Sequence, residues 1–214
     1  MIHNFLFDFD GTVGNTIEGI TITLKKTKEV MGYTYDMAEA ISLVGTPLIA
    51  MGEKLCGPDK AEEFTTSYRR EYITWGADKI SFFDGIQDLL VMLNEKNLHC
   101  AIVTSKMKDS LLNNLTQLNA HRYFDVLVTK ESTKIFKPNP DPVEFALKSL
   151  HAEKNDAVMI GDTRFDILAG KAAGVKTIGV TWGFDPKHVI EEVKPDYIAE
   201  TGTELIKICE GLAN

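Results

Sequence analysis

The alternation of hydrophobic and polar positions changes character twice along this chain. Ile2 to Phe9 is a short apolar run, which is typical of a strand buried on both faces. From residue 15 to about residue 81, apolar residues instead recur at the spacing of helices, and no stretch there has a convincing strand pattern. From Phe83 onward, short apolar runs and helical patterns alternate. This order predicts an α/β fold, in which a parallel sheet with helices on both faces carries an inserted bundle of helices.

The inserted bundle is expected to be entirely helical. Its predicted helices cover about 17–31, a short stretch after Asp36, 47–57 and 58–75. Four aromatic residues of the last helix are spaced to share one face: Phe64, Tyr68, Tyr72 and Trp75. We expect this stripe to pack against neighbouring helices rather than to bind a ligand.

The remainder of the chain predicts four more strands, separated by helices. The strands cover about 99–103, 125–128, 157–160 and 177–180, and the helices cover about 86–96, 111–118, 140–150, 165–173 and 204–212. With the first strand, they form one sheet. We therefore expect residues 1–14 and 82–214 to make up the sheet domain, and residues 15–81 to make up a helical one.

Composition and charge narrow the function classes. The chain has 214 residues, enough for one large domain or a domain with an insertion, and a formal net charge of −8 without any run of Lys or Arg. An acidic chain disfavours binding to nucleic acid or to anionic membranes. Its three cysteines are isolated, which fits a reducing cytosol, and no segment has the pattern of a signal peptide or a membrane span. We expect a cytoplasmic monomer or homodimer that acts on a small molecule.

Two acids stand where the first strand ends. Asp8 and Asp10 are one residue apart and are followed by Gly11. Carboxylates this close repel each other and lose water when buried, so stability gives no reason for the pair. A divalent cation would remove the conflict, and glycine would let the backbone turn sharply beside a ligand.

Further polar residues follow the later strands in the same way. They are Thr104, Ser105 and Lys106 after the second strand, Lys137 in the loop after the third, and Asp162 and Asp166 after the fourth. In open α/β sheets, ligands bind beyond the carboxyl ends of the strands. Carboxylates suit Mg²⁺, whereas hydroxyl and ammonium groups suit phosphate oxygens. The sequence therefore predicts a site for Mg²⁺ and a phosphoryl group.

Four motifs carry a resemblance to a known family: Asp8-x-Asp10-Gly11-Thr12, Thr104-Ser105, Lys137-Pro138 and Gly161-Asp162-x-x-x-Asp166. Together and in this order, they make the chain similar to the haloacid-dehalogenase-like phosphohydrolases, close to the phosphoglycolate phosphatase and bacterial pyrophosphatase branch. The resemblance covers essentially the whole chain. It implies a Rossmann-like parallel sheet core with a mobile helical cap, residues 15–81, whose joints lie near Gly14 and near Ser81 to Gly85, with the two glycines suited to absorb a change in the backbone.

The resemblance also implies a mechanism. Asp8 would attack the phosphoryl group to form an aspartyl-phosphate, and as an ordinary aspartate it would be ionised at neutral pH without a base. Asp10 would protonate the leaving oxygen and then activate water. Mg²⁺ would lie between an Asp8 oxygen, the Asp10 backbone carbonyl and Asp162. Asp166 would orient Lys137 or a metal-bound water.

The remaining assignments concern the substrate, which the resemblance implies to be a small phosphorylated metabolite, with phosphoglycolate or pyrophosphate as leading candidates. The residues expected to hold the phosphate are Gly11, Thr12, Thr104, Ser105 and Lys137. In the cap, Arg69, Arg70 and Thr46 are the candidates for contacts to the rest of the substrate. Many relatives have an acid where this chain has Asn15, a difference that concerns the hinge or the substrate rather than the chemical step.

Two other function classes remain open at this point. A phosphosugar mutase of the β-phosphoglucomutase type would share the fold, the motifs and the cap, and only its products would distinguish it. A non-enzymatic phospho-acceptor or binding module would also carry the aspartate. The cap and the acid Asp10 favour turnover over that second alternative.

Overall fold

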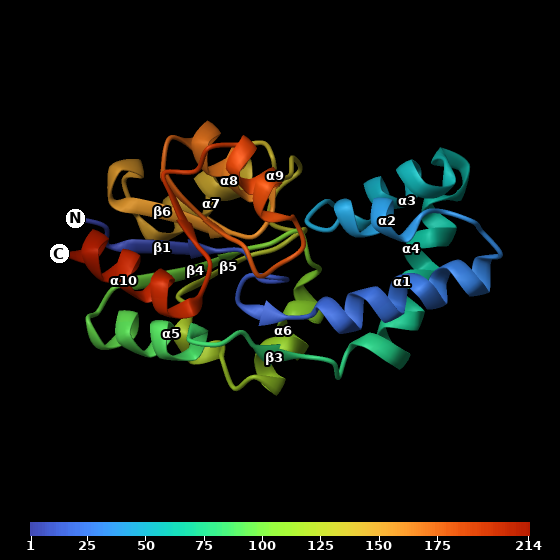
Figure 1. Ribbon diagram of the computed structural model, residues 1–214, viewed down its shortest axis with the longest axis horizontal. Coiled ribbons are helices and arrows are strands. Elements are labelled where there is room, and N and C mark those ends of the chain that lie inside the picture. The colour runs from blue at the N-terminus through green and yellow to red at the C-terminus, as the bar shows by residue number, and fades with distance from the viewer.

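Six parallel strands form the central sheet of the computed structural model, which describes residues 1–214 (Figure 1). Their order across the sheet is β5-β4-β1-β6-β7-β8. The strands are β1 (Asn4–Phe7), β4 (His99–Val103), β5 (Val126–Val128), β6 (Ala157–Gly161), β7 (Lys176–Val180) and β8 (Tyr197–Ala199). Because β1 pairs with β4 on one side and β6 on the other, its carboxyl end lies between the ends of these two strands.

Helices cover both faces of the sheet. They are α5 (Ile86–Glu95), α6 (Lys108–Gln117), α7 (Asp141–Leu150), α8 (Arg164–Ala173), α9 (Lys187–Glu192) and α10 (Gly202–Ala213). Successive side chains of a strand point to opposite faces. Phe5 and Phe7 of β1 therefore pack in the cluster that includes α5, α6 and α10, whereas Leu6 packs with α7 and α8. No helix in the protein is both long and apolar enough to cross a lipid bilayer.

Residues 15–81, which we call the helical unit, lie beyond the carboxyl ends of the sheet strands (Figure 1). The unit contains α1 (Ile17–Met31), α2 (Met37–Ser42), α3 (Leu48–Cys56), the 3₁₀ turn η1 (Pro58–Lys60), α4 (Ala61–Glu71) and the π-helical turn η2 (Tyr72–Gly76). Most of its apolar side chains form a separate cluster, in which Leu24 of α1 packs with Phe64 of α4 and Tyr72 of η2. Phe184, in the loop after β7, also belongs to this cluster, so the unit packs in part against the sheet domain.

A two-stranded ribbon joins the helical unit to the sheet. β2 (Gly14–Asn15) pairs antiparallel with β3 (Ser81–Phe82), so that Gly14 lies opposite Phe82 and Asn15 lies opposite Ser81. The chain consequently leaves the sheet and returns to it at one place. Two residues per strand are too few to show an alternating pattern, which is why the sequence did not reveal this ribbon.

Most expected elements are present, but several differ in extent. The helix expected over 58–75 is divided into η1, α4 and η2. Three residues of the aromatic stripe pack together, since Phe64, Tyr68 and Tyr72 are spaced 6.2 Å between successive ring centroids, but Trp75 is 48% exposed and lies outside this packing. The pattern missed α9 and β8, which have six and three residues. Such short elements show little periodicity, and β8 is held by its pairing with β7.

Candidate active site

A sharp turn after β1 brings Asp8 to the carboxyl edge of the sheet. Asp8 donates its backbone N–H to the carbonyl of Ile160 in β6 (2.9 Å). Gly11 follows with φ of 87°, a backbone angle that favours glycine. A Cβ at Gly11 would also overlap the carboxylate of Asp162, so the close approach of the turn to that acid requires glycine as well.

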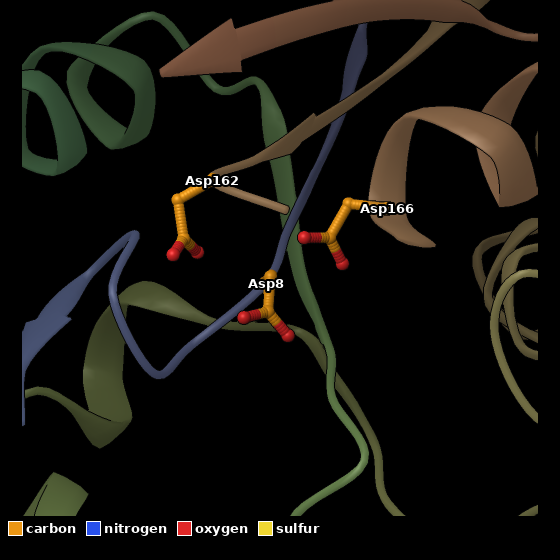
Figure 2. Close-up of side chains that lie close together, drawn as sticks. All are labelled: Asp8, Asp162 and Asp166. Atoms are coloured by element: carbon orange, nitrogen blue, oxygen red, sulfur yellow. The ribbon is translucent and has the colours of Figure 1, made fainter. Parts of the chain in front are cut away.

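Three buried carboxylates meet at this edge (Figure 2). Asp8 follows β1, Asp162 follows β6 and Asp166 lies in the first turn of α8, and one carboxylate oxygen from each lies within 4.8 Å of the others. Asp166 is fixed by a capping box, because its Oδ2 accepts the backbone N–H of Thr163 (3.0 Å) and the Thr163 hydroxyl (2.7 Å). Three such charges repel one another, so the cluster needs cations.

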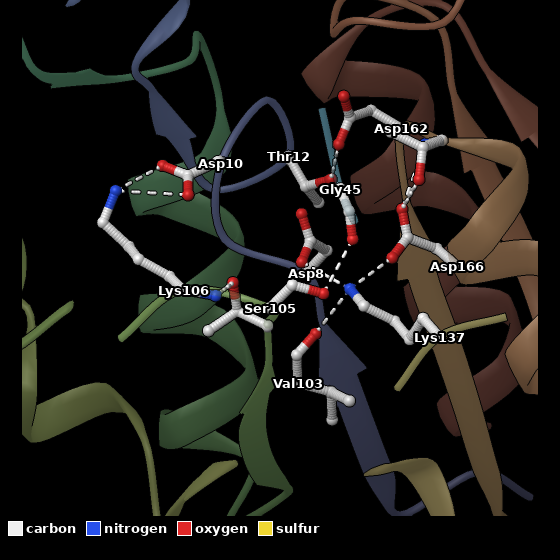
Figure 3. A network of polar contacts seen from close by, with 12 residues as sticks. Asp8, Asp10, Thr12, Gly45, Val103, Ser105, Lys106, Lys137, Asp162 and Asp166 are labelled. Atoms are coloured by element: carbon white, nitrogen blue, oxygen red, sulfur yellow. Dashed lines mark hydrogen bonds and ion pairs between the residues drawn. The ribbon is translucent and has the colours of Figure 1, made fainter. Parts of the chain in front are cut away.

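Lys137 supplies one positive charge to this cluster (Figure 3). Its buried Nζ donates to Oδ1 of Asp8 (2.6 Å), to Oδ1 of Asp166 (2.5 Å) and to the carbonyl of Val103 (2.9 Å). These contacts use all three ammonium protons. Burial lowers the pKa of Lys137, but Asp166 and Asp8 raise it more, so its pKa lies well above the ordinary value. Lys137 therefore stays protonated.

The acids themselves are harder to ionise than free aspartates. Burial raises the pKa of Asp8 to about 7, and the charge of Lys137 opposes this only in part. Burial, together with the charges of Asp8 and Asp166, raises the pKa of Asp162 well above its ordinary value. The expectation that Asp8 is fully ionised at neutral pH is therefore wrong for the metal-free protein, because its burial was not visible in the sequence.

These residues fit a divalent cation. Three carboxylates face one ammonium group, which leaves two buried negative charges when all three acids are ionised. Because Lys137 lies between Asp8 and Asp166, the better place for a cation is between Asp8 and Asp162. The Thr12 hydroxyl donates to Oδ1 of Asp162 (2.7 Å) and orients it. A donor set of carboxylate oxygens is the kind that Mg²⁺ prefers.

Asp10 is held to one side of this cluster by Lys106 (Figure 3). Nζ of Lys106 contacts both oxygens of Asp10 (2.8 and 3.2 Å), and the Thr16 hydroxyl donates to Oδ1 of Asp10 (2.9 Å). Lys106 also donates to the hydroxyl of Tyr72 in the helical unit (3.3 Å). Burial lowers the pKa of Lys106, but the charges and hydrogen bonds of Asp10 and Tyr72 together raise it more, to about 12. Asp10 thus has a charged partner that also contacts the helical unit.

The residues expected to bind phosphate differ in what they can still donate. The N–H of Gly11 donates to the carbonyl of Gly14 (3.0 Å), and the Thr12 hydroxyl is used by Asp162, so these two residues shape the turn. The Ser105 hydroxyl donates to the carbonyl of Gly45 in the helical unit (2.7 Å). The buried Thr104 accepts the backbone N–H of Lys106 at its hydroxyl (3.2 Å), which leaves the hydroxyl proton available.

A cavity of about 480 Å³ lies between the strand ends and the helical unit. Its lining includes six of the predicted site residues: Asp8, Asp10, Thr46, Arg69, Thr104 and Ser105. Arg70 is not among the lining residues, because its side chain is 63% exposed and pairs with Glu71 (3.1 Å). The structure therefore brings Arg69 and Thr46 to the site and leaves Arg70 outside it.

Two contributors to the site were not assigned by sequence reasoning, and a third was assigned only in part. Lys106 was placed among the strand-end residues that suit phosphate oxygens, but its contact with Asp10 was not expected. Tyr72 was counted only in the packing stripe, yet it also lines the cavity. The backbone N–H of Phe184, after β7, donates to Oδ2 of Asp162 (2.8 Å). A backbone donor leaves no mark in the side-chain pattern.

The sequence and the fold of this chain are similar to those of known proteins. Residues 5–180 match a family model described as haloacid dehalogenase-like hydrolase. The chain is 32% identical to the pyrophosphatase PpaX of Halalkalibacterium halodurans over 208 residues, which cover 97% of this chain and 96% of the relative. It is 31% identical to the pyrophosphatase PpaX of Listeria innocua over 209 residues, with 97% and 96% covered. A solved structure, described as a predicted phosphatase from Clostridium acetobutylicum, superposes with a TM-score of 0.89 at 27% identity and with 99% of both chains covered.

Proposed function

Because this chain belongs to the haloacid dehalogenase-like hydrolase family, we propose that it is a Mg²⁺-dependent phosphatase that hydrolyses a small phosphorylated metabolite through an aspartyl-phosphate. One observation carries the proposal. Asp8, Asp162 and Lys137 meet in a buried cluster at the end of β1, and Asp8 reaches a cavity that can hold a small substrate. This cluster combines a nucleophile with the charges that phosphoryl transfer requires.

In the first step, an oxygen of Asp8 attacks phosphorus, and the bond from phosphorus to the leaving oxygen breaks. Lys137 holds Oδ1 of Asp8, which leaves Oδ2 for the attack. Asp10 gives a proton to the leaving oxygen. Lys106 holds Asp10 at the cavity, with the shorter contact to Oδ1 (2.8 Å) and the longer one to Oδ2 (3.2 Å), so Oδ2 is the oxygen that can turn to the leaving group while Oδ1 stays held.

In the second step, water attacks phosphorus of the aspartyl-phosphate, Asp10 takes the proton, and inorganic phosphate leaves with Asp8 restored. Mg²⁺, held by Asp8, Asp162 and the backbone carbonyl of Asp10, would neutralise charge between the two anions that react. The free hydroxyl proton of Thr104 can donate to an oxygen of the phosphoryl group, while Lys137 holds Asp8 and supplies positive charge beside it. Asp166 keeps Lys137 in place through its ion pair.

For the substrate, phosphoglycolate and pyrophosphate are the first compounds to test. Two of the relatives are pyrophosphatases by name, which supports the second compound. The helical unit acts as a mobile cap that selects the substrate and excludes water, a proposal supported by its position across the cavity from Asp8.

Phosphate release from a panel of phosphorylated metabolites, measured with Mg²⁺ and with excess chelator, tests the proposed function. We expect turnover only with Mg²⁺, and inhibition by Ca²⁺, because calcium takes more ligands at longer distances and would misplace the Asp8 oxygen. Full activity in chelator would refute the role of the metal. An isomerised sugar phosphate instead of free phosphate would identify a mutase, and a stable phosphoprotein without turnover would identify a phospho-acceptor module.

A further inference from the structure

The cavity beside Asp8 is divided into a charged half and an apolar half. The charged residues that line it from the sheet side are Asp8, Asp10, Lys106, Asp109 and Lys130. The helical unit contributes six aliphatic side chains: Ile20, Val44, Leu48, Met51, Ile73 and Ala77. Arg69 is the one charged residue that lines the cavity from the helical unit. A bound substrate would therefore meet opposite kinds of surface at its two ends.

Ile73 is the clearest sign that the apolar half serves a ligand. Its side chain is 77% exposed, the largest exposed fraction among the large hydrophobic residues of the protein. Packing of the core therefore does not explain it. It lies in the π-helical turn η2, and such turns are frequent at functional sites. A side chain this exposed lies at the open mouth of the cavity, where an apolar ligand that covers it gains free energy.

The two leading substrate candidates fit this half poorly. Pyrophosphate would turn its second phosphate toward the helical unit, and phosphoglycolate would turn a carboxylate there. A charge placed against aliphatic side chains loses water and finds few donors there. Of the hydroxyl groups that the helical unit brings to the cavity, those of Thr46 and Tyr72 already donate to Leu43 and Asn114, which leaves that of Tyr68. Lys106 is already engaged by Asp10 (2.8 Å), and the guanidinium of Arg69 lies 3.7 Å from Sδ of Met107. The helical unit thus offers one cation to a second anionic group.

We propose that the natural substrate is a phosphate monoester of an organic alcohol with an apolar body, and that Ile73 and Leu48 are specificity-determining residues. The phosphoryl group faces Asp8, and the apolar body packs on the aliphatic wall of the helical unit. The volume of about 480 Å³ lies in the range of sites for organic ligands and exceeds what a small dianion fills. This inference rests on the proposed phosphatase function and narrows its substrate class.

A homologous series tests the substrate class: methyl, butyl and hexyl phosphate, compared with phosphoglycolate and pyrophosphate in the presence of Mg²⁺. We expect kcat/KM to rise about threefold to fourfold for each added methylene until the cavity is filled. A flat or falling series, or pyrophosphate as the best substrate, would overturn the inference and leave the phosphatase proposal standing. Hydrolysis of none of the five compounds would overturn both.

The variant Ile73→Ala tests the wall itself, and Val30→Ala is its matched control. Val30 of α1 is 54% exposed and does not line the cavity. Because both side chains are exposed, both variants should keep the wild-type melting temperature. We expect Ile73→Ala to lower kcat/KM about tenfold for hexyl phosphate and to leave methyl phosphate unchanged. Equal losses for both esters, or no loss for hexyl phosphate, would overturn the assignment of Ile73.

Discussion

In the buried cluster, one ammonium group joins two carboxylates, since Lys137 contacts both Asp8 and Asp166. Removing one partner from such a set leaves the others without compensation, and that loss can unfold a protein as well as stop its chemistry. A substitution here is informative only when it keeps the shape and hydrogen-bonding capacity of the side chain. The change from carboxylate to amide at Asp8 meets this condition.

We expect Asp8→Asn to fold and to lose turnover by at least about a thousandfold, because an amide does not attack phosphorus. In the metal-free protein, burial raises the pKa of Asp8 from 3.8 to about 7. Because its pKa is raised, Asp8 contributes stability to the folded state at pH values below its ordinary pKa of 3.8. This contribution is lost as the pH rises through about 7. An amide has no proton to lose. The melting temperature of the variant minus that of the wild type, measured in chelator, should therefore increase from about pH 5 to about pH 8.

The exposed Asp59 offers a control, since Asp59→Asn makes the same chemical change far from the cluster and should alter neither property. A folded Asp8→Asn protein with near wild-type activity would contradict the role of Asp8 as nucleophile. A melting-temperature difference that does not vary with pH would contradict its raised pKa.

Lys106 gives a second prediction at this scale. Its side chain is 8% exposed and it is the charged partner of Asp10. Lys106→Met should lower kcat about tenfold or more while KM changes little, because Asp10 keeps only the Thr16 hydroxyl to fix its position. The free energy of unfolding should fall by about 1–3 kcal/mol, as for other buried polar groups left without a partner. Lys106→Arg, which keeps the charge, should recover part of kcat; an unchanged kcat in Lys106→Met would refute the positioning role.

At the scale of elements, the sequence predicted the helices and strands that are long enough to show a repeating pattern of apolar residues. The buried strands and the amphipathic helices α1, α5, α7 and α8 appear in the sequence because each repeats one apolar face. The strand-end acids were predictable for a related reason, since parallel topology fixes which ends meet. The contacts of Lys106 with Tyr72 and of Ser105 with Gly45 were not, because they depend on where the helical unit lies against the sheet.

Helix α4 provides a test with its own control, because two adjacent arginines lie differently. Arg69 lines the cavity, whereas Arg70 pairs with Glu71 in solvent. We expect Arg69→Ala to raise KM about threefold to tenfold for phosphoglycolate and to change kcat little, since a cation at the cavity rim attracts a second anionic group. Arg70→Ala should match the wild type. Equal effects of the two variants on KM would show that Arg69 has no specific contact with the substrate.

At the scale of the whole molecule, the metal should act as a stabilising ligand. Cation binding requires ionised carboxylates, and the pKa values of Asp8 and Asp162 are both raised. Protons therefore compete with Mg²⁺ below about pH 7. The increase in melting temperature caused by Mg²⁺ should be larger at about pH 8 than at about pH 6, and at a hundred times the Kd it corresponds to about 2.7 kcal/mol.

Thermal unfolding with and without Mg²⁺ at the two pH values measures this linkage. The variant Asp8→Asn should lose most of the response, because it removes one of the proposed ligands. An equal increase at both pH values in the wild type would mean that the cation binds elsewhere than between Asp8 and Asp162.

The joint was expected near Gly14 and near Ser81 to Gly85, and Gly14 and Ser81 both lie in the ribbon that connects the two parts of the molecule. Gly85 was expected to bend with Gly14, yet Gly85 begins α5 and lies directly against the backbone of Gly202 in α10. Position 85 therefore needs a glycine because a side chain there would press against α10 within the sheet domain. Gly14, by contrast, lies in the ribbon of β2 and β3, so a hinge for the proposed cap would lie in that ribbon.

The same ribbon makes the helical unit exchangeable. Since the chain departs at Asn15 and comes back at Ser81, directly opposite, a different insert spliced between these two residues would break no strand and reroute no crossover of the sheet. Under the proposed function, the sheet residues that carry the chemistry and the insert that selects the substrate would be encoded in separate stretches of one gene. A new insert grafted at the same two positions would need to keep a donor equivalent to Thr16, whose hydroxyl contacts Asp10.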